Sequence, residues 1–222
     1  GVEGGGLHLF GPSSTGKTTL ALLAGSLCGG NENKGFVRQW RSTHNAIEHT
    51  AVQHNDGLLV MDESGQATAD TVAQTIYMLS NGQGKERMRA DATQRKTYQW
   101  RVQLFSTGEL TMDEKIEETG KFRAMAGQNV RVVNLPIDRG AGKNSYSCLH
   151  GFETPASLSE HLKDATRHFY GTPLRAFLTD LCGASSQELD ANGTDIKENI
   201  EKFAKTYCPD GSCGQVRRVA VK

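Results

Sequence analysis

The chain has 222 residues, and its 25 Lys and Arg balance its 25 Asp and Glu, so its formal net charge is zero. This length suits one large domain, or one domain with a small appendage, and the charge balance excludes a globally basic nucleic-acid binder while leaving room for a local basic patch. No apolar run approaches the roughly 18–20 residues of a membrane span, so we expect no membrane partner. Five scattered cysteines, an odd number, do not form a disulfide framework, and we expect a cytoplasmic protein.

The first 150 residues alternate between apolar runs and segments with helical spacing. The expected strands are residues 6–11, 35–40, 57–63, 97–109 and 129–138. The expected helices lie within 11–27, at 45–54, at 70–80 and after Thr111, with capping boxes at Asn45/Glu48 and Thr111/Glu114. This alternation predicts an α/β fold with a parallel sheet covered by helices.

The remaining residues, 151–222, have a mostly helical pattern. Two pairs place an N-cap residue before a proline at the first helical position, Thr154-Pro155 and Thr172-Pro173. A third helix is indicated by the spacing of Ile196, Ile200 and Phe203. We therefore expect residues 1–150 to form the core and residues 151–222 to form a helical C-terminal segment.

One segment carries a phosphate-binding motif. The pattern G-x-x-x-x-G-K-[ST] is matched without deviation, between a predicted strand and a predicted helix, by Gly11, Pro12, Ser13, Ser14, Thr15, Gly16, Lys17 and Thr18. In such a loop the backbone N–H groups surround a triphosphate, Lys17 reaches its β- and γ-phosphates, and the Thr18 hydroxyl binds Mg²⁺. We expect ATP and Mg²⁺ as cofactors, with the nucleotide held by Gly11 to Thr19.

Two adjacent acids end the predicted strand at 57–63. Asp62 and Glu63 follow four apolar residues, so they lie at the carboxyl edge of a buried strand, where open α/β sheets bind ligands. We expect Asp62 to hold Mg²⁺, directly or through water, and Glu63 to act as the general base toward an attacking water. The pair favours hydrolysis over phosphoryl transfer to a metabolite, because hydrolysis needs a fixed base for water.

The next predicted strand also ends in polar residues, Ser106-Thr107-Gly108-Glu109. A polar side chain at this place would lie beside the γ-phosphate and orient the water. Thr107 is the first candidate for this role and Glu109 the second. A plain turn is the alternative explanation of the same four residues.

A local basic excess lies between Gly82 and Arg101, where six bases stand against two acids. Lys85, Arg87 and Arg89 alternate as they would on one arm of a hairpin. Such a loop tracks a nucleic-acid backbone electrostatically, without reading its sequence. A solvated polar insertion is the alternative.

Two arginines near the fifth predicted strand are candidates for a trans-acting cation. In ring ATPases an arginine in this area reaches the γ-phosphate of the neighbouring subunit. Arg131 begins the strand and Arg123 precedes it. An ordinary surface arginine explains either position equally well.

Several stretches resemble a known family: GGGLHLFGPSSTGKTT, HNDGLLVMDE, YMLSNGQGKERM, LFSTGE and AGQNVRVVNLPID. They resemble the helicase-like P-loop ATPase domain of phage and integrative-element primases and replication proteins, a domain-of-unknown-function family numbered 927. More remotely, the chain resembles hexameric AAA+ helicases of the minichromosome-maintenance and viral types. The resemblance covers nearly the whole chain and implies a P-loop NTPase, AAA+-like fold and a role in replicating mobile DNA.

The remote resemblance also implies roles for individual segments. In those helicases a hairpin before the sensor strand moves DNA, and Gly82–Lys96 occupies that place. Their arginine finger falls where Arg131 stands, and their second sensor arginine resembles Arg217 in Val216-Arg217. The family sequence normally runs on past Lys222, so we expect residues 151–222 to be a partial, truncated lid-like region.

Two functions from different classes remain. The first is an ATP-driven DNA helicase or translocase motor that acts on single-stranded DNA as a homo-oligomer, a hexameric ring. The second is an ATP-dependent loader or scaffold that recruits a primase domain or polymerase without unwinding. A small-molecule kinase is a weaker third hypothesis, because no substrate-pocket motif is present and Glu63 is placed for water.

Overall fold

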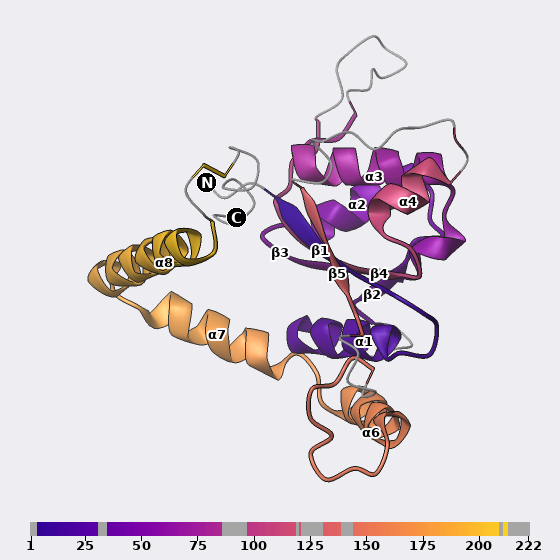
Figure 1. Cartoon of the computed structure of the whole chain (residues 1–222). Coiled ribbons are helices and arrows are strands. Elements are labelled where there is room, and N and C mark those ends of the chain that lie inside the picture. Colours follow the sequence, from indigo (N-terminus) through magenta and orange to yellow (C-terminus); the bar gives the residue numbers. More distant parts are fainter. Residues whose placement is uncertain are drawn as a thin grey trace.

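The computed structural model describes residues 4–30, 35–85, 97–118, 120, 131–138, 144–208 and 211–212. Its centre is a parallel sheet of five strands in the order β2-β3-β4-β1-β5 (Figure 1). The strands are β1 (Gly5–Phe10), β2 (Val37–Gln39), β3 (Gly57–Asp62), β4 (Val102–Gly108) and β5 (Val132–Pro136). The expected α/β fold, with five parallel strands, is confirmed.

Helices cover both faces of this sheet and continue beyond it. They are α1 (Lys17–Cys28), α2 (His44–Gln53), α3 (Ala69–Asn81), α4 (Met112–Glu117), α6 (Pro155–His168), α7 (Thr172–Gly183) and α8 (Ser186–Tyr207). Figure 1 shows α2, α3 and α4 on one face and α1, with α6 packed against it, on the other. Because β4 lies between β1 and β3, the segments that follow these three strands meet at one edge of the sheet.

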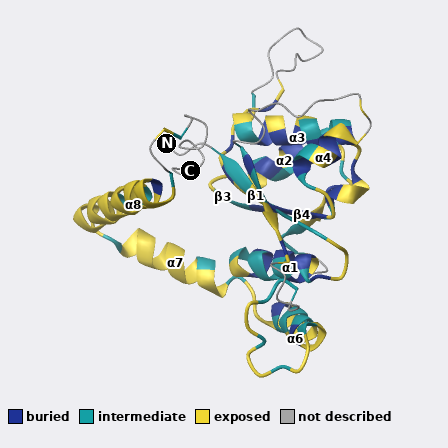
Figure 2. Ribbon diagram, viewed as in Figure 1, coloured by how far each residue is buried: buried dark blue, intermediate teal, exposed yellow. Residues whose placement is uncertain are grey.

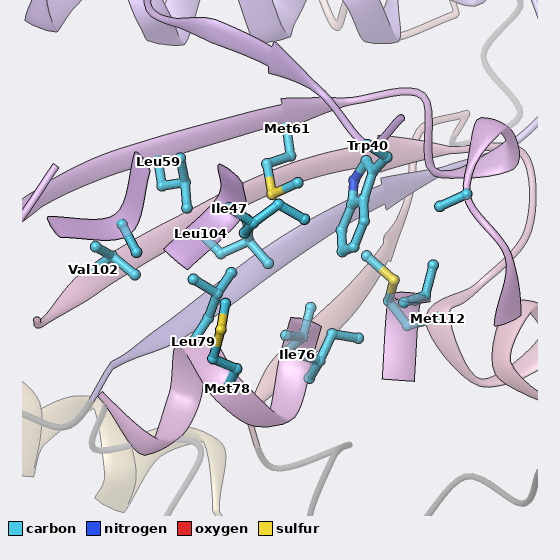
Figure 3. Close-up of a cluster of buried hydrophobic side chains, with 14 of the residues drawn as sticks. Trp40, Ile47, Leu59, Met61, Ile76, Met78, Leu79, Val102, Leu104 and Met112 are labelled. Carbon is cyan, nitrogen blue, oxygen red and sulfur yellow. The ribbon is translucent and has the colours of Figure 1, made fainter. Parts of the chain in front are cut away.

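The apolar core lies between the sheet and the helices α2, α3 and α4. Figure 3 shows its side chains converging from the strands and from this helical layer, with the indole of Trp40 among them. The buried members include Trp40, Ile47, Leu59, Met61, Ile76, Met78, Leu79, Val102, Leu104 and Met112. Burying each large side chain contributes about 1.5–3 kcal/mol, so this layer is a major source of the stability that holds the sheet in place.

The fourth strand begins later than its sequence pattern predicts. Gln83 and Gln99 form an antiparallel bridge, and the Trp100 N–H donates to the Gly82 carbonyl over 2.9 Å. Residues 98–100 therefore pair with the chain that follows α3 instead of with β3. This antiparallel pairing holds residues 82–84 against residues 98–100.

Two predicted helix starts are wrong by one or two residues. Helix α2 is capped by Thr43, whose hydroxyl accepts from the Ala46 N–H over 3.3 Å, so Asn45 and Glu48 form no capping box. Glu48 is 2% exposed and lies against Gly84, away from the first turn of the helix. Helix α7 is capped by Gly171, so Thr172 is its first residue.

The other predicted caps are confirmed. Thr111 and Glu114 form the capping box of α4. Thr154 caps α6, and Pro155 follows as the first residue of that helix. The third predicted C-terminal helix is also present as α8.

Helices α7 and α8 lie largely outside the packed layers, and Figure 2 shows them mostly exposed. Large apolar side chains stay in solvent along both helices, among them Phe177, Leu178, Ile196, Phe203 and Tyr207. No helix in the described part of the chain has the length and hydropathy that crossing a membrane requires.

We predict that Gly6→Ala destabilises the sheet. A Cβ at Gly6 would lie 2.7 Å from the Leu104 Cβ and 2.8 Å from the Leu104 carbonyl oxygen, so β1 and β4 would have to separate. The free energy of unfolding should fall by about 1–3 kcal/mol in urea titrations. The control is Gly193→Ala within α8, where no atom lies within 4 Å of the new Cβ, and this variant should gain about 0.5–1 kcal/mol. Equal effects at both positions would contradict the prediction.

Candidate functional site

The loop between β1 and α1 has the backbone of an anion cradle. Gly11 and Gly16 have φ of 148° and 93°, and Ser14 adopts a left-handed φ of 61°. A Cβ at Gly11 would come within 2.7 Å of Ile137, so glycine is required there. No side chain caps α1, whose first backbone N–H groups therefore face the loop. An uncapped helix N-terminus beside such a loop favours a bound phosphate.

The side chain of Lys17 is folded onto this loop. Its ammonium donates to the Gly11 carbonyl over 2.8 Å and to the Pro12 carbonyl over 2.6 Å, and the residue is 7% exposed. Burial lowers the pKa of Lys17, and the carboxylates of Glu109, Glu63 and Asp62 oppose that shift. The lysine thus lies between carbonyl oxygens and carboxylates, in a position from which a polyphosphate would attract it.

The polar residues of β3 and β4 meet at Thr107. The Thr107 hydroxyl donates to the Asp62 carboxylate and accepts from the Glu63 N–H over 3.1 Å. The same carboxylate oxygen accepts from the Thr18 hydroxyl at 3.4 Å, so the end of the phosphate loop joins the group. Asp62 and Thr107 are 5% and 1% exposed. The sheet order alone brings these residues together across 89 positions of sequence, from Thr18 to Thr107.

Glu63 has an unusual backbone. Its φ of 65° and ψ of 69° lie in the left-handed region, which costs a non-glycine residue of order 1 kcal/mol and is frequent at functional sites. The turn directs the chain away from β3 at once and leaves Glu63 at the wall of a pocket. The sequence showed the acid but not this conformation.

That pocket has a volume of about 480 Å³ and lies over the phosphate loop. It is lined by Ser13, Ser14, Gly16, Lys17, Thr18, Thr19, Glu63, Glu109, Ala156, Ser159, Glu160 and Lys163. The last four lie on one face of α6, and sequence reasoning missed them, because helical spacing does not show which face meets a distant loop. Lys163 pairs with Glu160 over 3.0 Å, so two lysines stand against three glutamates in this lining.

The predicted metal ligands have suitable chemistry for Mg²⁺. The Thr18 hydroxyl and the Asp62 carboxylate are hard oxygen donors already in contact. No cluster of three or more His, Cys, Asp or Glu side chains suited to a metal occurs among the described residues. Proteins commonly bind Mg²⁺ through one or two protein oxygens, while phosphate oxygens and water complete the coordination shell. The Thr18 and Asp62 oxygens fit this pattern.

Other predicted residues lie elsewhere. Arg131 precedes β5, at the end of the sheet opposite the phosphate loop. It donates to Asn81 over 3.2 Å and lies 5.2 Å from the ring centre of Tyr77. Lys85 is exposed beside the antiparallel bridge. Arg87, Arg89, Arg123 and Arg217 lie outside the described residues.

A buried histidine adjoins the site, and sequence reasoning missed it. His8 in β1 is 0% exposed, and its Nδ1 and Nε2 lie 3.0 Å from the Ser106 hydroxyl and 2.9 Å from the Leu110 carbonyl. Burial is the main cause that lowers its pKa to about 4. His54, the C-cap residue of α2, is also buried, at 8% exposure. Burial lowers its pKa too, and its Nδ1 bonds the Leu58 carbonyl.

Comparisons with known proteins bear on the fold. Residues 1–99 match the sequence model of the family described as "Domain of unknown function (DUF927)", which confirms the resemblance over that part of the chain. A solved structure described as "SCCmec type IV Cch - active helicase" matches with a TM-score of 0.73 and 22% sequence identity. The match covers 99% of this chain and 36% of the other, so this chain spans about a third of that protein's length. The P-loop α/β fold is thereby confirmed.

Weaker likenesses also occur. NtrX from Brucella abortus in complex with ATP has a TM-score of 0.39 and 18% identity, covering 62% of this chain and 32% of its own. The same protein with ADP has a TM-score of 0.37 and 14% identity, over 76% and 46%. No curated protein matches the sequence.

We predict that His8 makes stability depend on pH between about 7 and 4. Its folded pKa of about 4 lies below the ordinary 6.5, so the unfolded chain binds a proton first and stability falls as the pH drops through that window. The contribution reaches about 3 kcal/mol at 1.36 kcal/mol per pKa unit. Urea unfolding of the wild type and His8→Gln at pH 7 and 4.5 measures it. An identical loss of stability in both proteins would contradict the prediction.

Proposed function

We propose that this chain hydrolyses ATP and is the motor domain of a DNA helicase or translocase that serves the replication of mobile DNA. The observation that carries the hydrolysis is the Thr107 hydroxyl, which joins the Asp62 carboxylate to the Glu63 backbone beside the phosphate loop. A nucleotide-binding loop needs none of these contacts to hold phosphate. Their convergence supports a site built to activate water.

The residues divide the work as their positions suggest. The loop N–H groups and Lys17 hold the triphosphate, with Lys17 exchanging the Gly11 and Pro12 carbonyls for phosphate oxygens. Glu63 takes the proton of the attacking water as that water adds to the γ-phosphorus and the bond from this phosphorus to the bridging oxygen breaks, releasing ADP and phosphate. The hydrogen bonds of Thr107 hold the Glu63 backbone and the Asp62 carboxylate in fixed positions relative to each other. Thr18 and Asp62 would hold Mg²⁺, which would neutralise charge on the β- and γ-phosphates.

The charge of the pocket supports an oligomer. Three glutamates outnumber two lysines in its lining, yet the transition state for phosphoryl transfer gathers negative charge. A further cation from a neighbouring subunit would offset this excess. Arg131 lies at the opposite end of the sheet from its own phosphate loop, and it would serve an adjacent copy in a hexameric ring by exchanging its contacts with Asn81 and Tyr77; Arg123 and Arg217 are the alternative cations.

The DNA contact is assigned to the basic loop. Lys85, Arg87 and Arg89 follow α3 in the sequence, and the antiparallel bridge between Gln83 and Gln99 joins the described residues before and after this segment. The solved structure with a similar fold is described as an active helicase, which favours a motor over a static ATP-binding module. We propose single-stranded DNA as the nucleic-acid partner.

A loader or scaffold is the second candidate function. The observation that favours it is the row of exposed apolar side chains on α7 and α8, including Phe177, Ile196 and Phe203. Exposed apolar surface of this kind suits a protein partner, such as a primase domain or a polymerase. Stimulation of hydrolysis by DNA separates the two candidates.

We predict that Lys17→Ala abolishes ATP hydrolysis and that Glu63→Gln retains ATP binding while its turnover falls by about 10²–10⁴-fold, as for the loss of a general base. Steady-state phosphate release and equilibrium binding of a fluorescent ATP analogue measure the two effects. Lys197→Ala, an exposed lysine on α8, is the matched control and should behave as the wild type. Retained turnover in the lysine variant would remove the phosphate-loop assignment, and normal turnover in the glutamine variant would place the base elsewhere.

We predict that single-stranded DNA stimulates hydrolysis and that neutralising Lys85, Arg87 and Arg89 together removes the stimulation. The log–log dependence of DNA affinity on salt should flatten by about 2, at roughly 0.7 per phosphate contact. The matched control neutralises three exposed α8 lysines, Lys197, Lys202 and Lys205, which changes the net charge equally. If the salt dependence of DNA affinity flattens equally in both triple variants, the net charge of the protein explains the effect and the loop does not. Hydrolysis indifferent to DNA in the wild type would favour the loader.

A further inference from the structure

A directional chain of hydrogen bonds lies behind the site. The Leu110 carbonyl only accepts, so the His8 Nε2 carries the proton and donates over 2.9 Å. The neutral ring then accepts at Nδ1 from the Ser106 hydroxyl over 3.0 Å. Ser106 in turn accepts from the Trp40 indole N–H over 2.9 Å. One imidazole therefore bonds both ends of the short segment 106–110.

This segment contains the two candidate residues of β4. Successive strand residues point to opposite faces, so Ser106 faces His8 and Trp40 while Thr107 faces Asp62. Glu109 follows, and of the three carboxylates that raise the pKa of Lys17 against the effect of burial, it has the largest effect. The bonds of His8 to residues 106 and 110 thus flank Thr107 and Glu109 on the chain.

The backbone between these two bonds passes close to the imidazole. A Cβ at Gly108 would meet the Ser64 hydroxyl and would lie 3.0 Å from the His8 Cε1. Ser64 is the residue after Glu63 and is 1% exposed. The turn at Gly108 is therefore enclosed by His8 on one side and by the segment of Glu63 on the other.

We propose that His8 is a positioning residue for the reaction: its two hydrogen bonds fix the turn 106–110 so that Thr107 stays on Asp62 and Glu63, and Glu109 stays beside Lys17. This inference rests on the proposed function. His8 is not among the residues that line the pocket, and its hydrogen bonds are to Ser106 and Leu110, so it acts through these two residues. Loss of its bonds should reduce turnover and leave nucleotide affinity almost intact.

The test compares two substitutions that keep different halves of the imidazole. In His8→Gln the side-chain amide can donate near the Nε2 position, and in His8→Asn only the Nδ1 position is replaced. We expect kcat of the Asn variant to fall about tenfold, the size of one lost buried hydrogen bond, with the dissociation constant for ATP unchanged. The Gln variant keeps the bond to the Leu110 carbonyl and loses the bond from Ser106, so its kcat should fall less than that of the Asn variant.

The matched control is His54→Gln. His54 is a second buried histidine whose bond is to the Leu58 carbonyl, at the start of β3. This variant should lose thermal stability and keep its kcat. Should His8→Asn fail to fold, Ser106→Ala replaces it, because it removes the donor to Nδ1 with a small change of volume and should lower kcat in the same way.

Amide hydrogen exchange separates this proposal from the function on which it rests. Exchange at residues 108–111 in the nucleotide-free protein should rise in His8→Asn and stay at the wild-type rate in His54→Gln. If the wild type hydrolyses no ATP, the proposed function fails, and exchange still decides whether His8 holds the turn. Wild-type kcat and unchanged exchange in both His8→Asn and Ser106→Ala would overturn the proposal, as would equal losses in kcat and ATP affinity.

Discussion

The hydroxyl group of Thr107 is the contact on which the rest of the site depends. It is buried, and it satisfies at once a buried carboxylate and a backbone N–H in a left-handed turn. In a site of low dielectric, an unpaired partner would cost about 1–3 kcal/mol, so the three groups hold one another in place. The strained backbone of Glu63 persists because Thr107 and the 3₁₀ turn at Ser64–Gln66 both require it.

The sheet supplies the geometry for that contact. With β4 between β1 and β3, the ends of three parallel strands and the start of α1 lie side by side at one edge. The opposite face of the same strands carries the core and the His8–Ser106–Trp40 chain. Strand β4 therefore contributes to both faces of the sheet. Ser106 bonds His8 and Trp40 on the core face, and Thr107 bonds Asp62 on the face of the site.

For the proposed hydrolysis, the charges of the pocket lining favour a further cation. Lys17 is held among carboxylates and carbonyl oxygens, which keeps the cation close to the loop but leaves an acidic pocket for a polyphosphate. A neighbouring subunit that brings a cation would make hydrolysis depend on assembly. The exposed apolar faces of α7 and α8 are consistent with further contacts between proteins.

Local sequence determined much of this protein. Residues Gly11 to Thr18, the apolar run before Asp62-Glu63 and the alternation of strands and helices were sufficient to predict the sheet, the loop and the acids, because each depends on neighbours in the chain. Helix starts at Thr111 and Thr154 were predictable for the same reason. The role of α6 in the pocket, the burial of His8 and His54, and the exchange of strand pairing before Val102 were not. Those features arise from contacts between residues far apart in sequence, and only the tertiary structure decides which distant surfaces meet and which polar groups must then find partners.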